Sequence, residues 1–68
     1  MQWYQFRERI MEELNIGKRR ASNIEMAFRR KYKGHKLAIQ KICKILYNDD
    51  GRITFTIEIN NKEKEITL

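Results

Sequence analysis

Residues 37 to 68 have the sequence LAIQKICKILYNDDGRITFTIEINNKEKEITL, and the fold depends on how this stretch is interpreted. In its second half, apolar residues such as Ile53 and Phe55 alternate with polar ones, and this period of two predicts a half-buried strand. A two-residue turn at Asn60-Asn61 would pair the strand with the end of the chain. Phe55 then lies opposite Ile66, so we expect a C-terminal β-hairpin.

The first half of the same stretch has a period typical of a helix. The apolar residues that fall on one helical arc are Ala38, Ile39, Ile42, Ile45 and Leu46. We expect this helix to begin at His35 or Lys36. Asn48-Asp49-Asp50-Gly51 is a cluster of turn-forming residues that would end it.

Two further helices are expected before residue 35. The first is indicated by apolar residues at steps of three or four, which are Trp3, Phe6, Ile10 and Leu14. It should run from about residue 2 to Asn15, with Gly17 supplying the left-handed conformation that follows many helices. Ser22-Asn23-Ile24-Glu25 fits a capping box, so the second helix should begin at Ser22 and end at Gly34.

The expected fold is α+β, with a three-helix unit followed by a C-terminal antiparallel β-hairpin, in the order α-α-α-β-β. Residues 1-68 form a single domain. This winged-helix-like order is similar to that of winged helix-turn-helix proteins, and Leu37 to Leu68 carry the resemblance. The resemblance implies that the third helix enters the DNA major groove and that the hairpin forms the wing. The hairpin departs from that class because its charge is acidic.

Composition indicates a small folded domain of the cytoplasm. The chain has 68 residues, 41% of them hydrophobic, and no proline, which is enough apolar content for a packed core. Its single cysteine, Cys43, favours a reducing compartment. No apolar run approaches the roughly 20 residues of a membrane span, so the protein is expected to be soluble.

Positive charge is concentrated in the middle of the chain. The net charge is +6, and residues 17 to 36 alone contribute +7. We expect the second and third helices to present this charge on one surface, and Lys18, Arg19 and Arg20 to form a mobile basic cluster just before the second helix. The predicted nucleic-acid-binding residues are Lys18, Arg19, Arg20, Arg29, Arg30, Lys33, Lys36, Gln40, Lys41 and Lys44. The Gln40 amide could read adenine in the major groove, and DNA is favoured over RNA as the partner.

A second hypothesis keeps the same surface but changes its partner. The basic face could dock on an acidic surface of a larger complex, as a small inhibitor or adaptor encoded by a phage or mobile element would do. If Tyr4 and Met11 are exposed, they provide a contact for a homodimer. An anionic membrane is a weaker alternative, because little apolar area is expected beside the charges.

No catalytic residue, metal site or cofactor is predicted. His35 is the only histidine and has no cysteine or carboxylate at metal-ligand spacing, so we expect a surface or capping role. Asp49 and Asp50 are interpreted as turn residues. Cys43 is interpreted as a small core residue. The protein is therefore expected to be a binding module and not an enzyme.

Overall fold

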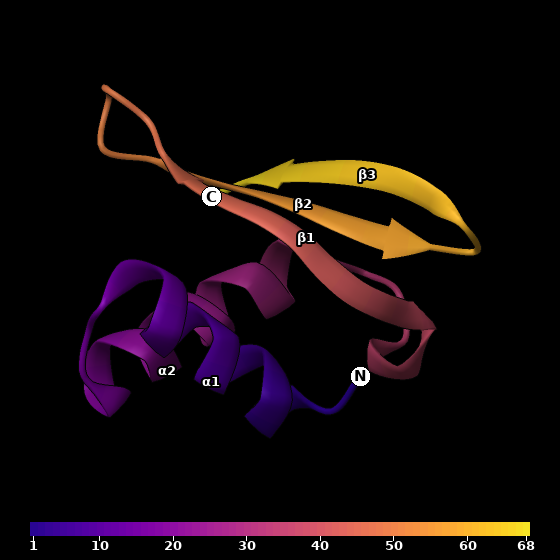
Figure 1. Ribbon diagram of the computed structural model, residues 1–68, viewed down its shortest axis with the longest axis horizontal. Coiled ribbons are helices and arrows are strands. Elements are labelled where there is room, and N and C mark those ends of the chain that lie inside the picture. The colour runs from indigo at the N-terminus through magenta and orange to yellow at the C-terminus, as the bar shows by residue number, and fades with distance from the viewer.

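Both helices lie against one face of a three-stranded sheet, and the other face of the sheet is open (Figure 1). The computed structural model describes every residue from Met1 to Leu68. Its elements are α1 (Trp3–Leu14), α2 (Lys18–Lys31), the 3₁₀ helix η1 (Lys36–Ala38), β1 (Ile39–Tyr47), β2 (Ile53–Ile59) and β3 (Lys62–Thr67). The strands are antiparallel in the order β1-β2-β3. The fold is α+β, with the element order α-α-β-β-β.

The segment predicted to be a third helix is the edge strand β1, so the three-helix unit and the winged-helix order are wrong. The pairing of β1 with β2 shifts between Ile39 and Lys41 and again between Ile42 and Lys44. A bulge of this kind inserts one extra residue into a strand. Ile39, Ile42 and Ile45 therefore all face the core at steps of three. That spacing resembles the period of a helix, about 3.6 residues.

The predicted β-hairpin is confirmed. Phe55 pairs with Ile66, and Glu58 pairs with Glu63. The turn residues Asn60 and Asn61 have φ values of 52° and 62°. Positive φ at both central positions suits the right-handed twist of the strands that the turn joins, and asparagine tolerates it better than most residues.

The edge strand β3 carries opposite charges on its two faces. Lys62 and Lys64 lie on the side of the sheet that faces the helices, because their partners in β2, Ile59 and Ile57, lie on that side. The intervening residues Glu63 and Glu65 lie on the open face. All four side chains are exposed.

The predicted bounds of the first helix are confirmed, but those of the second are not. α1 ends at Leu14, and its C-cap residue Asn15 takes the left-handed conformation expected of Gly17 (φ 51°, ψ 53°). Gly17 has φ −75° and is the N-cap of α2, which begins before Ser22. Ser22 and Glu25 therefore lie within the helix, and Glu25 is buried instead of forming a cap.

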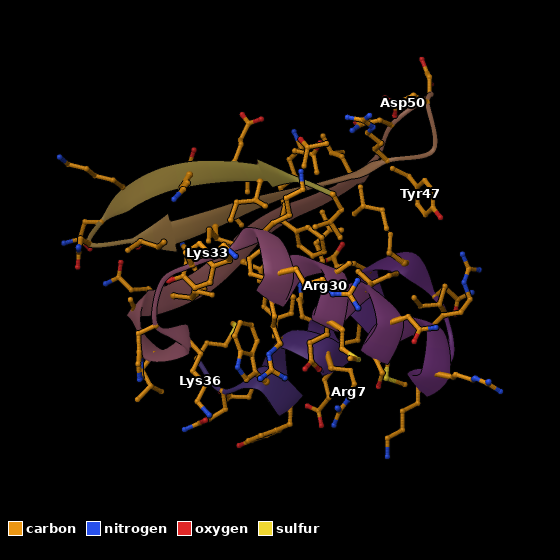
Figure 2. The ribbon with its side chains drawn as sticks, turned by 180° about the vertical axis from the view of Figure 1, so that it is seen from behind. Arg7, Arg30, Lys33, Lys36, Tyr47 and Asp50 are labelled. Carbon is orange, nitrogen blue, oxygen red and sulfur yellow. The ribbon has the colours of Figure 1, made fainter.

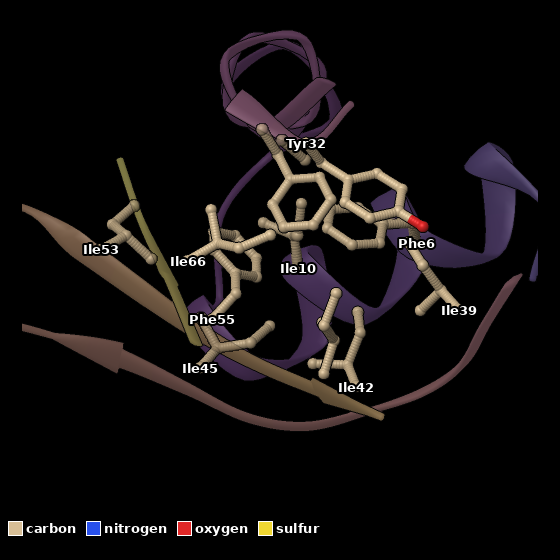
Figure 3. Packing of buried hydrophobic residues seen from close by; sticks show 12 residues of the cluster. Phe6, Ile10, Tyr32, Ile39, Ile42, Ile45, Ile53, Phe55 and Ile66 are labelled. Carbon is tan, nitrogen blue, oxygen red and sulfur yellow. The ribbon is translucent and has the colours of Figure 1, made fainter. Parts of the chain in front are cut away.

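Three phenylalanine rings from three different elements meet at the centre of the core. Figure 3 labels two of them, Phe6 and Phe55. The ring of Phe6 in α1 lies 4.4 Å from that of Phe28 in α2 and 5.4 Å from that of Phe55 in β2, measured between centroids. Phe28 and Phe55 are 5.1 Å apart, and all three side chains are fully buried. Trp3, one of the apolar residues whose spacing predicted the first helix, is half-buried and packs edge-on against Phe6.

The chain after α2 is held by a contact between Tyr32 and Gly34. The Tyr32 hydroxyl donates a hydrogen bond of 2.9 Å to the carbonyl of His35, and its ring is buried against Phe28. A Cβ atom placed on Gly34 would lie 2.6 Å from Cζ of Tyr32. Glycine is required here because the aromatic ring occupies the space of a side chain.

We therefore expect Gly34→Ala to lower stability by about 1–3 kcal/mol, since the buried ring must move to accept the methyl group. The corresponding fall in Tm is about 5–15 °C for a domain of this size. Thermal unfolding followed by circular dichroism measures it. Gly17→Ser is the control, because no atom lies within 4 Å of a Cβ at that position. Equal melting of Gly34→Ala and the wild type would contradict this account.

Candidate functional site

The structure separates the ten residues predicted to form one surface. Six of them remain together on α2 and the segment after it, but the other four lie on η1 and β1. In Figure 2, Arg30 lies on α2 and Lys33 lies just beyond its C-terminal end, whereas Lys36 lies apart from them on η1. Two adjacent basic helices do not exist in this fold.

The predicted site residues of β1 have contacts within the sheet. Oε1 of Gln40 accepts a hydrogen bond of 2.9 Å from the backbone N–H of Asn61, in the turn between β2 and β3. Nζ of Lys41 lies 3.8 Å from a carboxylate oxygen of Glu58. The placement of Gln40 on a helix is therefore wrong, because it is a bulge residue of β1 that supports a turn.

The cations of α2 form the candidate site. Lys18, Arg19 and Arg20 make up the first turn of the helix, and Arg29, Arg30 and Lys31 lie in its last turn. Lys33 follows directly, and all seven of these side chains are exposed. Sequence reasoning missed Lys31, although the density of positive charge around it was a usable signal.

Four exposed residues of α2 form a line along the side that faces away from the core. We call Arg19, Asn23, Met26 and Arg30 the outer stripe of α2. Their spacing of four, three and four places them on one helical face, and all four are exposed. The opposite face of the helix carries its buried residues, which are Ala21, Glu25 and Phe28. Met26 is 51% exposed, so its apolar side chain is accessible on this face of the helix.

The one carboxylate of α2 points into the protein. Glu25 is only 5% exposed. It lies 3.4 Å from a guanidinium nitrogen of Arg7 in α1 and 3.4 Å from one of Arg29. The guanidinium of Arg29 also lies over the ring of Trp3, 5.0 Å from its centroid. Arg29 therefore helps to join the helices, and no negative charge remains on the exposed side of α2.

The positive charge of the first turn does not stabilise the helix. A helix N-terminus favours anions, and each cation there costs about 0.3–1 kcal/mol. The first turn of α2 has no acidic residue, and its N-cap, Gly17, has no side chain to accept a hydrogen bond. Of the three basic residues, Arg20 has a hydrogen-bond partner, the hydroxyl of Tyr47, at 3.4 Å. This cluster is therefore electrostatically unfavourable for the helix itself.

The remaining polar candidates have local roles. Nδ1 of His35 accepts a hydrogen bond from the backbone N–H of Leu37, which confirms the predicted capping role. Asp50 accepts one from the backbone N–H of Arg52 in the turn between β1 and β2, as its interpretation as a turn residue requires. Cys43 is half-buried at a bulge and is not a core residue.

The structure has no pocket, no group of three side chains placed to bind a metal ion, and no helix of the length and hydropathy that crossing a bilayer requires. Comparison of the chain with protein-family models, curated proteins and solved structures gave no match. The candidate site is thus defined by surface charge and shape alone.

We expect Glu25→Ala to lower the free energy of unfolding by about 1–3 kcal/mol, because Arg7 and Arg29 would then repel each other without a shared partner. Chemical unfolding in urea measures the change. Glu12→Ala is the matched control, since Glu12 is exposed on α1 and forms no ion pair. Its effect should stay within about 0.5 kcal/mol. Equal losses in the two variants would show that the buried carboxylate does not join the helices.

Proposed function

We propose that the protein binds nucleic acid through the exposed side of α2. The observation that carries the proposal is the segregation of charge: this surface has many cations and no exposed carboxylate. An ordinary solvated helix mixes both signs, because oppositely charged neighbours stabilise it and like charges destabilise it. A surface of one sign is suited to a partner of the opposite sign.

The dimensions of α2 suit a polyanion. Its 14 residues extend over about 21 Å, at a rise of about 1.5 Å per residue. Cations occur at both ends of this length and just beyond it, at Lys33. Duplex DNA carries about one negative charge per 1.7 Å of its axis, so several phosphates lie within reach of the helix. Each neutralised phosphate releases counterions, and the affinity gains from that release.

An acidic protein surface is the alternative partner, and the exposed side chain of Met26 favours it. Thioethers at exposed positions are common in protein contacts. A pull-down performed with and without nuclease separates the two partners. Loss of the captured material after nuclease supports nucleic acid, whereas capture of a defined acidic protein that survives nuclease supports the alternative.

The proposal predicts strongly salt-dependent binding. If about five phosphates are contacted, the association constant should fall about 10²- to 10³-fold between about 50 mM and about 200 mM salt. Fluorescence anisotropy with labelled 20-nucleotide duplexes and single strands, of DNA and of RNA, measures it. Absence of binding to all of them at the lower salt concentration would refute the proposal.

Substitution of the outer stripe should weaken this binding. We expect Arg19→Ala with Arg30→Ala to lower affinity about tenfold or more at low salt and to reduce the salt slope by about two. The matched control is Lys62→Ala with Lys64→Ala, which removes the same charge from the exposed part of β3. A similar loss in both double variants would indicate that net charge matters and that α2 has no special role.

A further inference from the structure

We infer that the partner of α2 is B-form duplex DNA, that the outer stripe of α2 enters its major groove, and that Asn23 contacts a base there. This inference rests on the proposed function and adds the class of nucleic acid, the groove and the base-contacting residue. It is carried by the arrangement of side chains around the exposed half of the helix.

The exposed side of α2 matches the major groove of B-form DNA in shape. With its side chains an α-helix is about 10–12 Å across, and the major groove of B-form DNA is about 12 Å wide. α2 exposes its outer side over its whole length, from Arg19 to Arg30. The major groove of an A-form RNA duplex is deep and narrow, and protein side chains cannot read it. A helix exposed in this way fits the groove of DNA and not that of duplex RNA.

The outer stripe carries side chains that can contact the edges of bases. Its centre is formed by Asn23 and Met26, an amide and an apolar side chain, with Arg19 and Arg30 at the two ends. An asparagine amide can donate to N7 and accept from N6 of adenine in one planar contact, with the donor and acceptor roles matched to that edge. An apolar group can contact the thymine methyl group. Asn23 has no hydrogen-bond partner within the protein, so its amide is free.

Cations of α2 lie on both sides of the outer stripe. At about 100° per residue, Lys18 lies to one side of the outer stripe, and Arg20 and Lys31 lie to the other. All three are exposed. A helix in the major groove has a phosphate strand on each side of it, and cations on both flanks match these two strands.

Single-stranded nucleic acid is disfavoured because the protein has no surface for base stacking. Single strands are bound mainly by aromatic side chains that stack on successive bases. The central strand of the open sheet face presents Thr54, Thr56 and Glu58 there, none of them aromatic. The exposed aromatic residues Tyr4 and Tyr47 lie on separate elements, α1 and β1. The protein therefore lacks the platform that such binding requires.

The test compares full-length protein on duplexes of one sequence. We expect B-form DNA to bind about tenfold or more tightly than the RNA duplex. A DNA duplex whose cytosines carry glucosyloxymethyl groups, which fill the major groove and leave the phosphates unchanged, should lose about tenfold or more of its affinity. Equal binding to the plain and glucosylated duplexes, or tighter binding to RNA or to single strands, overturns the inference while nucleic-acid binding stands. No binding to any of these probes refutes the proposed function itself.

A second measurement tests Asn23. Selection from a random DNA duplex pool gives a preferred sequence, and the ratio of affinities for preferred and random duplex is compared for wild type and Asn23→Ala. We expect this ratio to be about tenfold lower in the variant than in the wild type, because the base contact is lost. The salt slope should be unchanged, because the removed side chain is neutral. Ser22→Ala, a half-buried neighbour on α2, is the control and should keep the ratio. An unchanged ratio in Asn23→Ala, or a wild-type protein without any preferred sequence, rules out Asn23 as the base-contacting residue.

Discussion

The packing of Phe6 between Phe28 and Phe55 is the contact on which the rest of the structure depends. These three rings come from α1, α2 and β2 and lie within the single buried cluster that joins the helices to the sheet. Aromatic pairs bury large areas and gain about 0.5–1.5 kcal/mol beyond that burial. In a chain of 68 residues, with a small core and no cross-link, much of the stability must come from this contact. It also sets the orientation of α2, because Phe28 faces inward and the outer stripe therefore faces solvent.

Buried charge completes the contact between the two helices. Glu25 holds Arg7 of α1 and Arg29 of α2, and Arg29 covers Trp3. Glu25 is the only carboxylate of α2 and is buried between the helices. The exposed side of the helix therefore carries positive charge alone. The charge of the exposed side of α2 is in this way a consequence of how the helices are joined.

Local patterns in the sequence predicted the parts of the fold in which periodicity is regular. The alternation around Phe55 and the Asn60-Asn61 turn predicted the hairpin and its register, and the apolar spacing of the first helix predicted its bounds. β1 could not be predicted in this way, because two bulges place its inward residues at a nearly helical spacing. The three isoleucines at these positions were a signal in favour of a strand, since β-branched residues are enriched in strands.

The candidate site was predictable in composition but not in arrangement. The basic block between residues 17 and 36 was evident, and most of it lies on α2. Ser22 and Glu25 have the spacing of a capping box, so the second helix was expected to begin at Ser22. The three basic residues before it, Lys18, Arg19 and Arg20, were therefore expected to lie outside the helix, whereas α2 begins at Lys18. Gln40 and Lys44 were assigned to the face of a third helix. That helix does not exist, because residues 39–47 form β1. The contacts of Glu25 with Arg7 and Arg29 are tertiary, and the sequence pattern did not predict them.

The charge pattern of β3 limits how two copies of the protein can associate. When an edge strand pairs antiparallel with the same strand of a second copy, residues on the same face come to lie opposite one another. Lysines would then meet lysines on the helix side, and glutamates would meet glutamates on the open side. The repulsion between like charges opposes pairing of this edge strand with a second copy, although its backbone N–H and C=O groups are unpaired. Charged side chains on edge strands often have this effect.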